Sequence, residues 1–225
     1  MEYWKWPEFT WKTGGGDWTR AAGLAAGIDV GTTSSQAVVL QDGKLCAAAS
    51  VRTGADFKKS AASVFERVLE EGGITPGQIK AVGATGFGKR NAGYATNFFD
   101  EVLCIAKGAR FLFGPSVRTV VDLGGQTVKA IRLHSWDRVR DFMMNDKCAT
   151  GFGRNIEEMA ETLQVPVTEL GARSLDVEMD PEPVSTTCYS FANPETVGLF
   201  RTGFREKPSS ENEVIAAYLF AVAWR

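Results

Sequence analysis

The 225-residue chain lacks any run of about eighteen consecutive apolar residues, so no segment is predicted to cross a membrane as a helix. Its first residues also lack the basic-then-apolar pattern of a secretory signal. The formal net charge is only −2, which gives no electrostatic case for binding nucleic acid or an anionic membrane surface. These absences predict a soluble, cytoplasmic protein with neither nucleic acid nor a membrane as partner.

Cysteine and histidine are scarce, with four cysteines and one histidine in the whole chain. No Cys-x-x-Cys pair occurs, so a zinc ribbon or a thioredoxin-like redox pair is unsupported. Widely separated cysteines do not resemble a secreted disulfide framework, and they suit a reducing compartment. His134 follows an apolar segment beside a turn, where a surface role is expected rather than a role as ligand or base.

Two of the cysteines lie just before segments with helical features. Cys148 precedes apolar residues at helical spacing, and Cys188 precedes Asn193, which is predicted to cap a helix. A thiolate at a helix N-terminus faces unpaired N–H groups, which lower its pKa and favour bound negative charge. A two-fold dimer would bring together four such thiolates, the number that a [4Fe-4S] cluster usually needs. Cys46 and Cys104, in contrast, lie in apolar surroundings and fit ordinary packing residues.

Short strands and helices alternate along the chain. One strand ends in Ile28-Asp29-Val-Gly31 and a later one in Val121-Asp122-Leu-Gly-Gly125, and each is followed by a hairpin and a helix. This repeat suggests two related α/β domains. The predicted strands are 26–30, 36–40, 45–51, 79–85, 118–123, 128–133 and 139–143, and the predicted helices are 57–71, 98–113, 195–203, 212–224 and a segment after Cys148.

The two Asp-x-Gly copies resemble the paired phosphate motifs of the acetate kinase, sugar kinase and actin superfamily. That resemblance implies an α/β fold of two related domains with ATP in the cleft between them. It implies a first phosphate loop of Asp29, Gly31, Thr32 and Thr33, and a second of Asp122, Gly124, Gly125 and Gln126. A carboxylate at each strand end can hold Mg²⁺. Asp122 or Gln126 is expected to orient the attacking water.

A second resemblance is carried by Asn145-Asp-Lys-Cys148-Ala-Thr-Gly-Phe-Gly-Arg154, followed forty residues later by Cys188-Tyr-Ser-Phe-Ala. This pattern is similar to the ATP-dependent activators of 2-hydroxyacyl-CoA dehydratases and to the ATP-hydrolysing subunits of benzoyl-CoA reductase. The resemblance extends from about Ala26 to the C-terminus. It implies that Cys148 and Cys188 of each subunit hold one [4Fe-4S] cluster across a dimer interface.

In the resembled family, ATP hydrolysis drives an electron of very low potential into a partner enzyme. The expected partners are a second copy or a homologous subunit, a CoA-thioester reductase or dehydratase, and a low-potential donor such as ferredoxin. A benzoyl-CoA reductase is preferred, because the Trp-rich leader and the Asp180-Pro-Glu-Pro-Val-Ser approach to Cys188 look more like the reductase subunits. One departure is Thr127, where the activators commonly have Asp.

The expected organisation is a Trp- and Gly-rich arm (1–22), a first ATPase domain (23–115) and a second (116–225). The arm either packs over its own domain or forms a contact surface for a partner. In the resembled family a further segment completes the second domain, so that domain is expected to be incomplete here. The apolar helix 212–224 is then expected to lack part of its cover.

Two other functions fit part of the pattern. A small-molecule kinase of the same superfamily would have similar phosphate loops, but it would have no reason to place cysteines at two helix starts. A non-catalytic fragment would agree with the absence of the further segment, which in the resembled family carries a Gly-Gly motif for adenosine. Phosphate release without an added acceptor distinguishes the electron-transfer ATPase from the kinase.

Overall fold

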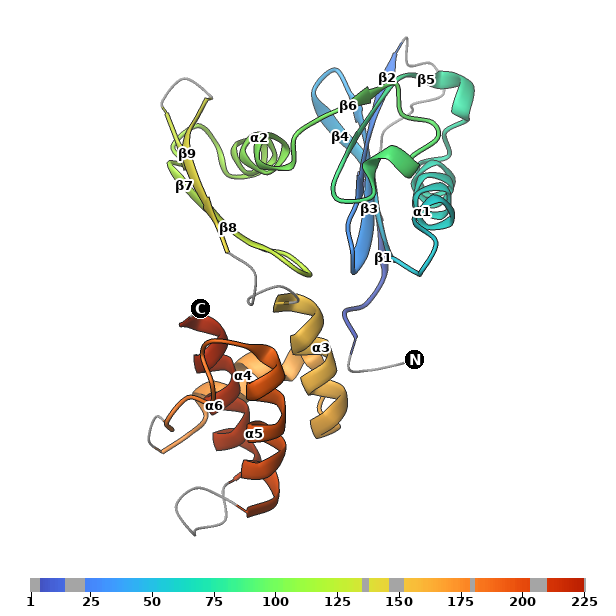
Figure 1. The fold of residues 1–225 in the computed structure, drawn as a ribbon. Coiled ribbons are helices and arrows are strands. Elements are labelled where there is room, and N and C mark those ends of the chain that lie inside the picture. Colours follow the sequence, from blue (N-terminus) through green and yellow to red (C-terminus); the bar gives the residue numbers. More distant parts are fainter. Residues whose placement is uncertain are drawn as a thin grey trace. The chain divides into compact units, whose positions relative to one another are not determined.

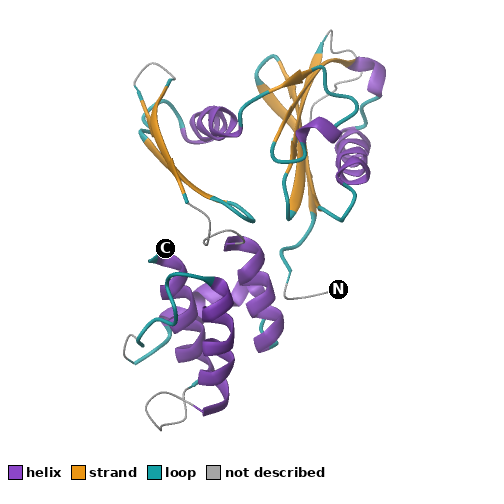
Figure 2. Ribbon diagram, in the orientation of Figure 1, coloured by secondary structure: helices purple, strands orange, loops and turns teal. Residues whose placement is uncertain are grey.

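The computed structural model describes residues 5–14, 23–134, 138–145, 152–178, 181–202 and 210–224. It divides into two compact units (Figure 1). The sheet unit comprises Glu8–Gly125 and Lys129–Met143, and the helical unit comprises Met1–Pro7, Gln126–Val128 and Met144–Arg225. The strands gather in the sheet unit, and the helical unit is built mainly from helices (Figure 2).

A six-stranded sheet with the order β1-β4-β3-β2-β5-β6 forms the base of the sheet unit. Its strands are β1 (Phe9–Lys12), β2 (Leu24–Val30), β3 (Ser34–Gln41), β4 (Lys44–Arg52), β5 (Ile79–Thr85) and β6 (Asn97–Phe98). β2 pairs antiparallel with β3 and parallel with β5. Asp42 and Gly43 join β3 to β4 with φ of 49° and 76°, which is the backbone that a tight two-residue hairpin turn requires. The hairpin predicted after the first Asp-x-Gly strand is therefore confirmed.

The helix α1 (Phe57–Gly72) lies along one face of this sheet (Figure 1). The Asp56 side chain accepts the N–H of Lys59, and Gly73 ends the helix in the left-handed conformation, with φ 64°. Val64, Phe65 and Val68 on α1 are buried in one cluster with the inward-facing strand residues. Alternation along the strands supplies one side of this core and helical periodicity supplies the other, which confirms the helix predicted at 57–71.

The second part of the sheet unit contains α2 (Glu101–Phe113) and a three-stranded sheet, β7-β8-β9. Its strands are β7 (Thr119–Leu123), β8 (Val128–Leu133) and β9 (Val139–Met144), which agree with the predicted strands. The start predicted for α2, at residue 98, is wrong. Asn97 and Phe98 instead pair parallel with β5, and Asp100 caps the helix by accepting the N–H of Leu103.

The helical unit is formed by α3 (Phe152–Leu163), α4 (Leu170–Leu175), α5 (Tyr189–Thr202) and α6 (Glu211–Ala223). A short 3₁₀ turn at Val167–Glu169 precedes α4, and the sheet unit has two further 3₁₀ turns, at Pro76–Gln78 and Lys89–Asn91. The expectation that the apolar helix 212–224 lacks part of its cover is wrong for most of its apolar residues, although Trp224 is 79% exposed. Val214, Ile215 and Tyr218 are at most 1% exposed and share one core with residues of α3, α4 and α5.

The start of α5 also differs from the prediction. Asn193 does not cap this helix, because the helix already begins at Tyr189 and includes Pro194. The Cys188 carbonyl accepts the N–H groups of Phe191 and Ala192, so Cys188 itself stands at the helix start. Burial of Ala192 within the helical core outweighs the local helix-breaking tendency of Pro194.

Part of the N-terminal arm joins the sheet unit as its edge strand. β1 pairs antiparallel with β4, with Phe9 opposite Ser50 and Trp11 opposite Ala48. The Glu8 carboxylate accepts the N–H of Arg52 and forms an ion pair with Arg67 at 2.7 Å. Trp11 remains 44% exposed, so a role for the arm in contacting a partner stays a prediction.

Candidate functional site

The carboxyl ends of β2 and β5 place Asp29 and Thr85 next to each other at one edge of the large sheet. The two strands are parallel, and Asp29 stands opposite Thr85 in the pairing. Asp29 Oδ1 is buried and has no hydrogen-bond partner among the described residues. A buried carboxylate oxygen without a partner is unusual in a folded protein, and it points to a ligand at this position.

The electrostatic surroundings of Asp29 favour its neutral form. Desolvation by burial raises its pKa from 3.8 to about 6, and the negative charges of Glu101 and Asp122 act in the same direction. The positive charge of Lys129 acts against them. Asp29 is therefore influenced by the negative charges of two other carboxylates, and a bound cation would offset this negative charge.

The first predicted phosphate loop follows Asp29 directly and connects β2 to β3. Gly31 lies so close to the chain that a Cβ there would stand 2.5 Å from the Ser34 carbonyl oxygen, so glycine is required. Thr32 and Thr33 complete the turn, and the Thr33 carbonyl accepts the N–H of Thr53 at 2.9 Å. The loop thus combines a tight glycine turn with two hydroxyl side chains.

The second predicted loop meets the first within the sheet unit. Asp122 lies on β7 near its end, and Gly124 and Gly125 follow. A Cβ at Gly125 would overlap the Oγ1 and Cβ atoms of Thr33. The structure therefore brings together two loops whose glycines are about ninety residues apart in sequence. Gln126 follows directly in the chain and is exposed, and its predicted role stays a prediction.

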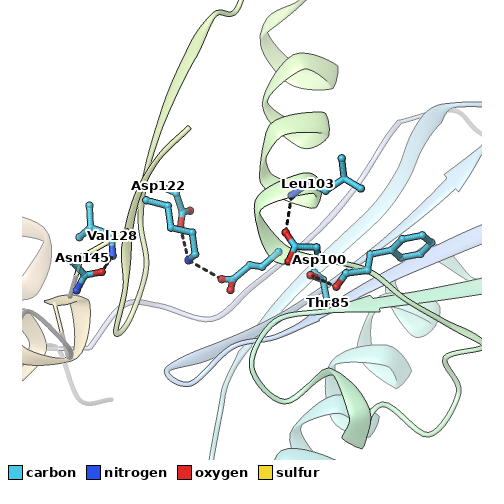
Figure 3. A network of polar contacts seen from close by, with 9 residues as sticks. Thr85, Asp100, Leu103, Asp122, Val128 and Asn145 are labelled. Atoms are coloured by element: carbon cyan, nitrogen blue, oxygen red, sulfur yellow. Dashed lines mark hydrogen bonds and ion pairs between the residues drawn. The ribbon is translucent and has the colours of Figure 1, made fainter. Parts of the chain in front are cut away.

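Glu101 and Lys129 are site residues that the sequence analysis missed. The Lys129 ammonium lies 3.0 Å from Glu101 Oε1 and 3.4 Å from Asp122 Oδ2, and dashed lines in Figure 3 mark the two contacts. Glu101 stands in the first turn of α2, directly after the Asp100 cap. The run Asp100-Glu101 at a helix start was the only sequence signal for it.

Gly86 is a further residue that the sequence analysis did not single out. It follows Thr85 with φ 86°, and a Cβ there would overlap Asp29 Oδ1 and approach the Val30 carbonyl oxygen at 2.7 Å. The loop after β5 therefore packs against Asp29 through a glycine. Only a residue without a side chain allows this approach at a positive φ.

This set of residues fits a phosphate group accompanied by a divalent cation. Asp29, Glu101 and Asp122 supply carboxylates, and the Gly31 and Gly125 turns let backbone N–H groups approach an anion. Among the described residues, no three His, Cys, Asp or Glu side chains lie close enough to hold a metal by themselves. Mg²⁺ commonly keeps several waters and shares one or two carboxylates with substrate phosphates, so this arrangement suits it.

An apolar cavity of about 440 Å³ lies beside Asp29 on the sheet unit. The residues that alternate with the buried core positions of β2, such as Ala25 and Gly27, form its floor. Phe99 and Cys104 also line it. Burial raises the pKa of the Cys104 thiol, so this thiol is disfavoured as a thiolate at neutral pH.

The cysteines predicted to hold a cluster are described only in part. Cys148 lies outside the described residues. Cys188 is half-buried at the start of α5, and its carbonyl accepts the N–H groups of Phe191 and Ala192 in the first turn of the helix. Cys46 is completely buried in the core of the sheet unit, as expected of a packing residue.

Comparison with solved structures places the fold of this chain in one class. The activator of the 2-hydroxyisocaproyl-CoA dehydratase from Clostridium difficile, solved with bound ADPNP, is 31% identical with a TM-score of 0.79. It is matched over 89% of this chain and 72% of its own. The fold is therefore the α/β fold of actin-like ATPases and sugar kinases, as predicted.

The family follows from the sequence. The model of the BadF/BadG/BcrA/BcrD ATPase family matches residues 26–203, and the chain belongs to this family. The activator of lactoyl-CoA dehydratase from Anaerotignum propionicum is 38% identical over 200 residues, which cover 88% of this chain and 74% of the relative. A benzoyl-CoA reductase subunit from Thauera aromatica is 29% identical, over 80% of this chain and 64% of the relative.

The chain therefore spans between 64% and 74% of the length of these proteins. Within the described part of the chain, no helix is both long and apolar enough to span a membrane.

Proposed function

We propose that this protein is an ATP-hydrolysing electron-transfer component that serves a CoA-thioester dehydratase or reductase. One observation carries the proposal: the two Asp-Gly loops meet at Gly125 and Thr33, and the first loop follows Asp29, whose buried Oδ1 has no hydrogen-bond partner among the described residues. A site made of two glycine turns, with carboxylates at the ends of their strands, suits the phosphates of Mg·ATP. Membership of an ATPase family supports the same conclusion.

The residues of the two loops have distinct proposed roles. Gly31, Thr32 and Thr33, with Gly124 and Gly125 from the other loop, bind the phosphates through N–H and hydroxyl groups. Asp29 and Asp122 would hold Mg²⁺, which would supply positive charge against the transferred phosphoryl group. Asp122 or Gln126 positions the attacking water.

The electron-transfer part of the proposal rests on Cys148 and Cys188. One [4Fe-4S] cluster would take two thiolates from each subunit of a dimer, and it supplies the one-electron chemistry. Cys188 stands at the start of α5, where the helix dipole favours a thiolate and a negatively charged cluster. An external low-potential donor such as ferredoxin would reduce the cluster.

The relatives include both kinds of partner enzyme. Identity is 38% to a dehydratase activator and 29% to a benzoyl-CoA reductase subunit. The proposal therefore names the shared chemistry, delivery of an electron to a CoA-thioester enzyme. The preference for a benzoyl-CoA reductase stays a prediction.

The test of the ATPase proposal is phosphate release from Mg·ATP without an added acceptor. Asp29→Asn and Asp122→Asn should each lower kcat by about 100-fold or more, because each removes a carboxylate that would hold Mg²⁺. Asp42→Asn is the matched control, since Asp42 is a turn residue at which Asn is equally suitable. Normal turnover in both site variants would contradict the assignment, and phosphate release only with a small-molecule acceptor would favour a kinase.

A further inference from the structure

Lys129 is one of the most deeply buried side chains of the protein, with 2% of its side chain exposed. It lies on β8, which neighbours β7 in the three-stranded sheet. An ammonium group at this depth is unfavourable unless it is paired and hydrogen-bonded. Its partners include Glu101 on α2 and Asp122 on β7, so one buried charge connects three elements.

The two carboxylates are more exposed than the ammonium that they contact. The Glu101 side chain is 41% exposed and the Asp122 side chain 30% exposed. Lys129 therefore approaches both carboxylates from the protein interior, at one oxygen of each. Their second oxygens are not used in these two contacts, and this is the arrangement expected when carboxylates are held for a ligand outside.

Lys129 offsets part of the negative charge that surrounds Asp29. Asp29, Glu101 and Asp122 interact electrostatically, and Lys129 is the cation among them. Like charges at short range repel, and long side chains relieve this repulsion by turning towards water. A merely stabilising role explains a buried ion pair poorly, because a hydrophobic replacement is often as stable.

We propose that Lys129 is a positioning residue of the ATP site, which holds the Glu101 and Asp122 carboxylates in a fixed orientation. This inference rests on the proposed ATPase function. Lys129 contacts neither the nucleotide nor the attacking water in this proposal. Its effect on hydrolysis passes through the two carboxylates, whose placement must be correct to about 1 Å for full activity.

The kinetic test compares Lys129→Met, Lys129→Arg and a control, with fold verified by circular dichroism. Lys129→Met should lower kcat about 100-fold with little change in KM, because preorganisation is lost while the phosphate loops remain. Lys129→Arg restores the charge and should return kcat to within about tenfold of wild type. The control is Lys107→Met, which removes an exposed lysine from α2 and should leave kcat and KM unchanged.

A second measurement does not depend on nucleotide. Thermal unfolding of Lys129→Met, Glu101→Gln and the double variant tests whether the two side chains are coupled. Removing Lys129 alone leaves carboxylates uncompensated, so the double variant should unfold at least about 3 °C above the value that additivity predicts. If Lys129→Met does not fold, Lys129→Gln, alone and combined with Glu101→Gln, replaces it in both measurements.

The outcomes separate the inference from the function on which it rests. A wild-type protein that releases no phosphate would overturn the proposed ATPase function, and the inference with it. An active wild type together with a folded Lys129→Met variant of unchanged kcat would overturn the positioning role alone. Additive thermal effects, or equal losses of kcat in folded Lys129→Met and Lys129→Arg, would also overturn it.

Discussion

Tyr189 and Glu158 join the two helices that follow the predicted cluster cysteines: Tyr189 Oη lies 3.1 Å from Glu158 Oε2. Tyr189 comes directly after Cys188 on α5, and Glu158 lies on α3. Burial, together with the negative charge of Glu158, raises the pKa of Tyr189. The hydroxyl therefore stays protonated at neutral pH and donates to the carboxylate, while the Asn193 amide donates to the hydroxyl at 3.1 Å.

Tyr189→Phe should lower the free energy of unfolding by about 1 kcal/mol, because a hydrogen bond to a charged, half-buried partner is removed. Chemical denaturation of both proteins at neutral pH measures the difference. Tyr94→Phe is the control, because the Tyr94 ring packs on Phe65 at a centroid distance of 4.7 Å and this contact remains. Equal stability of wild type and Tyr189→Phe would show that the hydrogen bond between α3 and α5 contributes nothing.

Gly86→Ala should destabilise the protein by about 2 kcal/mol and impair the site. The added Cβ would strain a backbone with φ 86° and would collide with Asp29 Oδ1. Unfolding and phosphate release are measured on the same preparation. Gly93→Ala is the matched control, because a Cβ at Gly93 meets no atom within 4 Å. The proposed packing of Gly86 on Asp29 is wrong if both alanine variants behave alike.

The raised pKa of Asp29 predicts a pH-dependent stability in the absence of nucleotide and divalent cations. The ordinary value is 3.8 and the folded value is about 6. Between these two values the folded state keeps a proton that the unfolded state has released. Stability should therefore fall as pH rises from about 4 to about 6, and the loss is complete above pH 6.

The free energy of unfolding should fall by at most about 3 kcal/mol across this pH range. Asp29→Asn removes this titration, so the variant should gain stability relative to wild type between about pH 4 and about pH 7.5. Denaturation curves of the two proteins at both pH values measure the gain. Asp42→Asn keeps Asp29, so its stability should fall with rising pH as that of wild type does. A stability difference between Asp29→Asn and wild type that is the same at both pH values would contradict the buried, proton-binding state of Asp29.

The four cysteines should divide into two classes when each is changed to Ser. Anaerobically prepared wild-type protein should hold about four irons per dimer, and Cys148→Ser or Cys188→Ser should lose the iron. Cys46→Ser and Cys104→Ser should keep it, at a cost of roughly 1–3 kcal/mol where a hydroxyl replaces a buried thiol. Iron content measured against oligomer mass checks all four variants. An iron-free monomer that hydrolyses ATP, whichever cysteine is present, would end the electron-transfer proposal.

Local sequence signals were sufficient for much of the fold. The hairpin at Asp42-Gly43 and the helix α1, with its Asp56 cap and Gly73 stop, were predictable because their determinants lie within a few residues. The two Asp-Gly loops were predictable for a similar reason, since an acid and glycines at a strand end are adjacent in the chain. Their family resemblance was predictable from the same residues, and the family match confirms it.

Competition between local and tertiary preferences caused the errors. Asn193 and Pro194 are good residues for a helix start, yet α5 begins at Tyr189, because burying Ala192 and Thr196 favours a longer helix. The start of α2 differs from the prediction for a similar reason: Phe98 pairs with β5 as part of β6, and Asp100 caps the helix. The cover of α6 likewise came from α4 and α5, which no local pattern could indicate.

The sequence by itself determined the family, the paired loops and the residue types that phosphate and metal chemistry need, because these signals are local in the chain. Tertiary structure alone decided that Gly125 packs on Thr33 and that Asp29 has a buried oxygen without a partner among the described residues. It also decided that Lys129 reaches Glu101, which lies 28 residues away in the chain. A lysine and a glutamate are ordinary surface residues in a sequence. The packing of α2 near β7 and β8 removes Lys129 from water. Away from water, its positive charge acts more strongly on the neighbouring carboxylates.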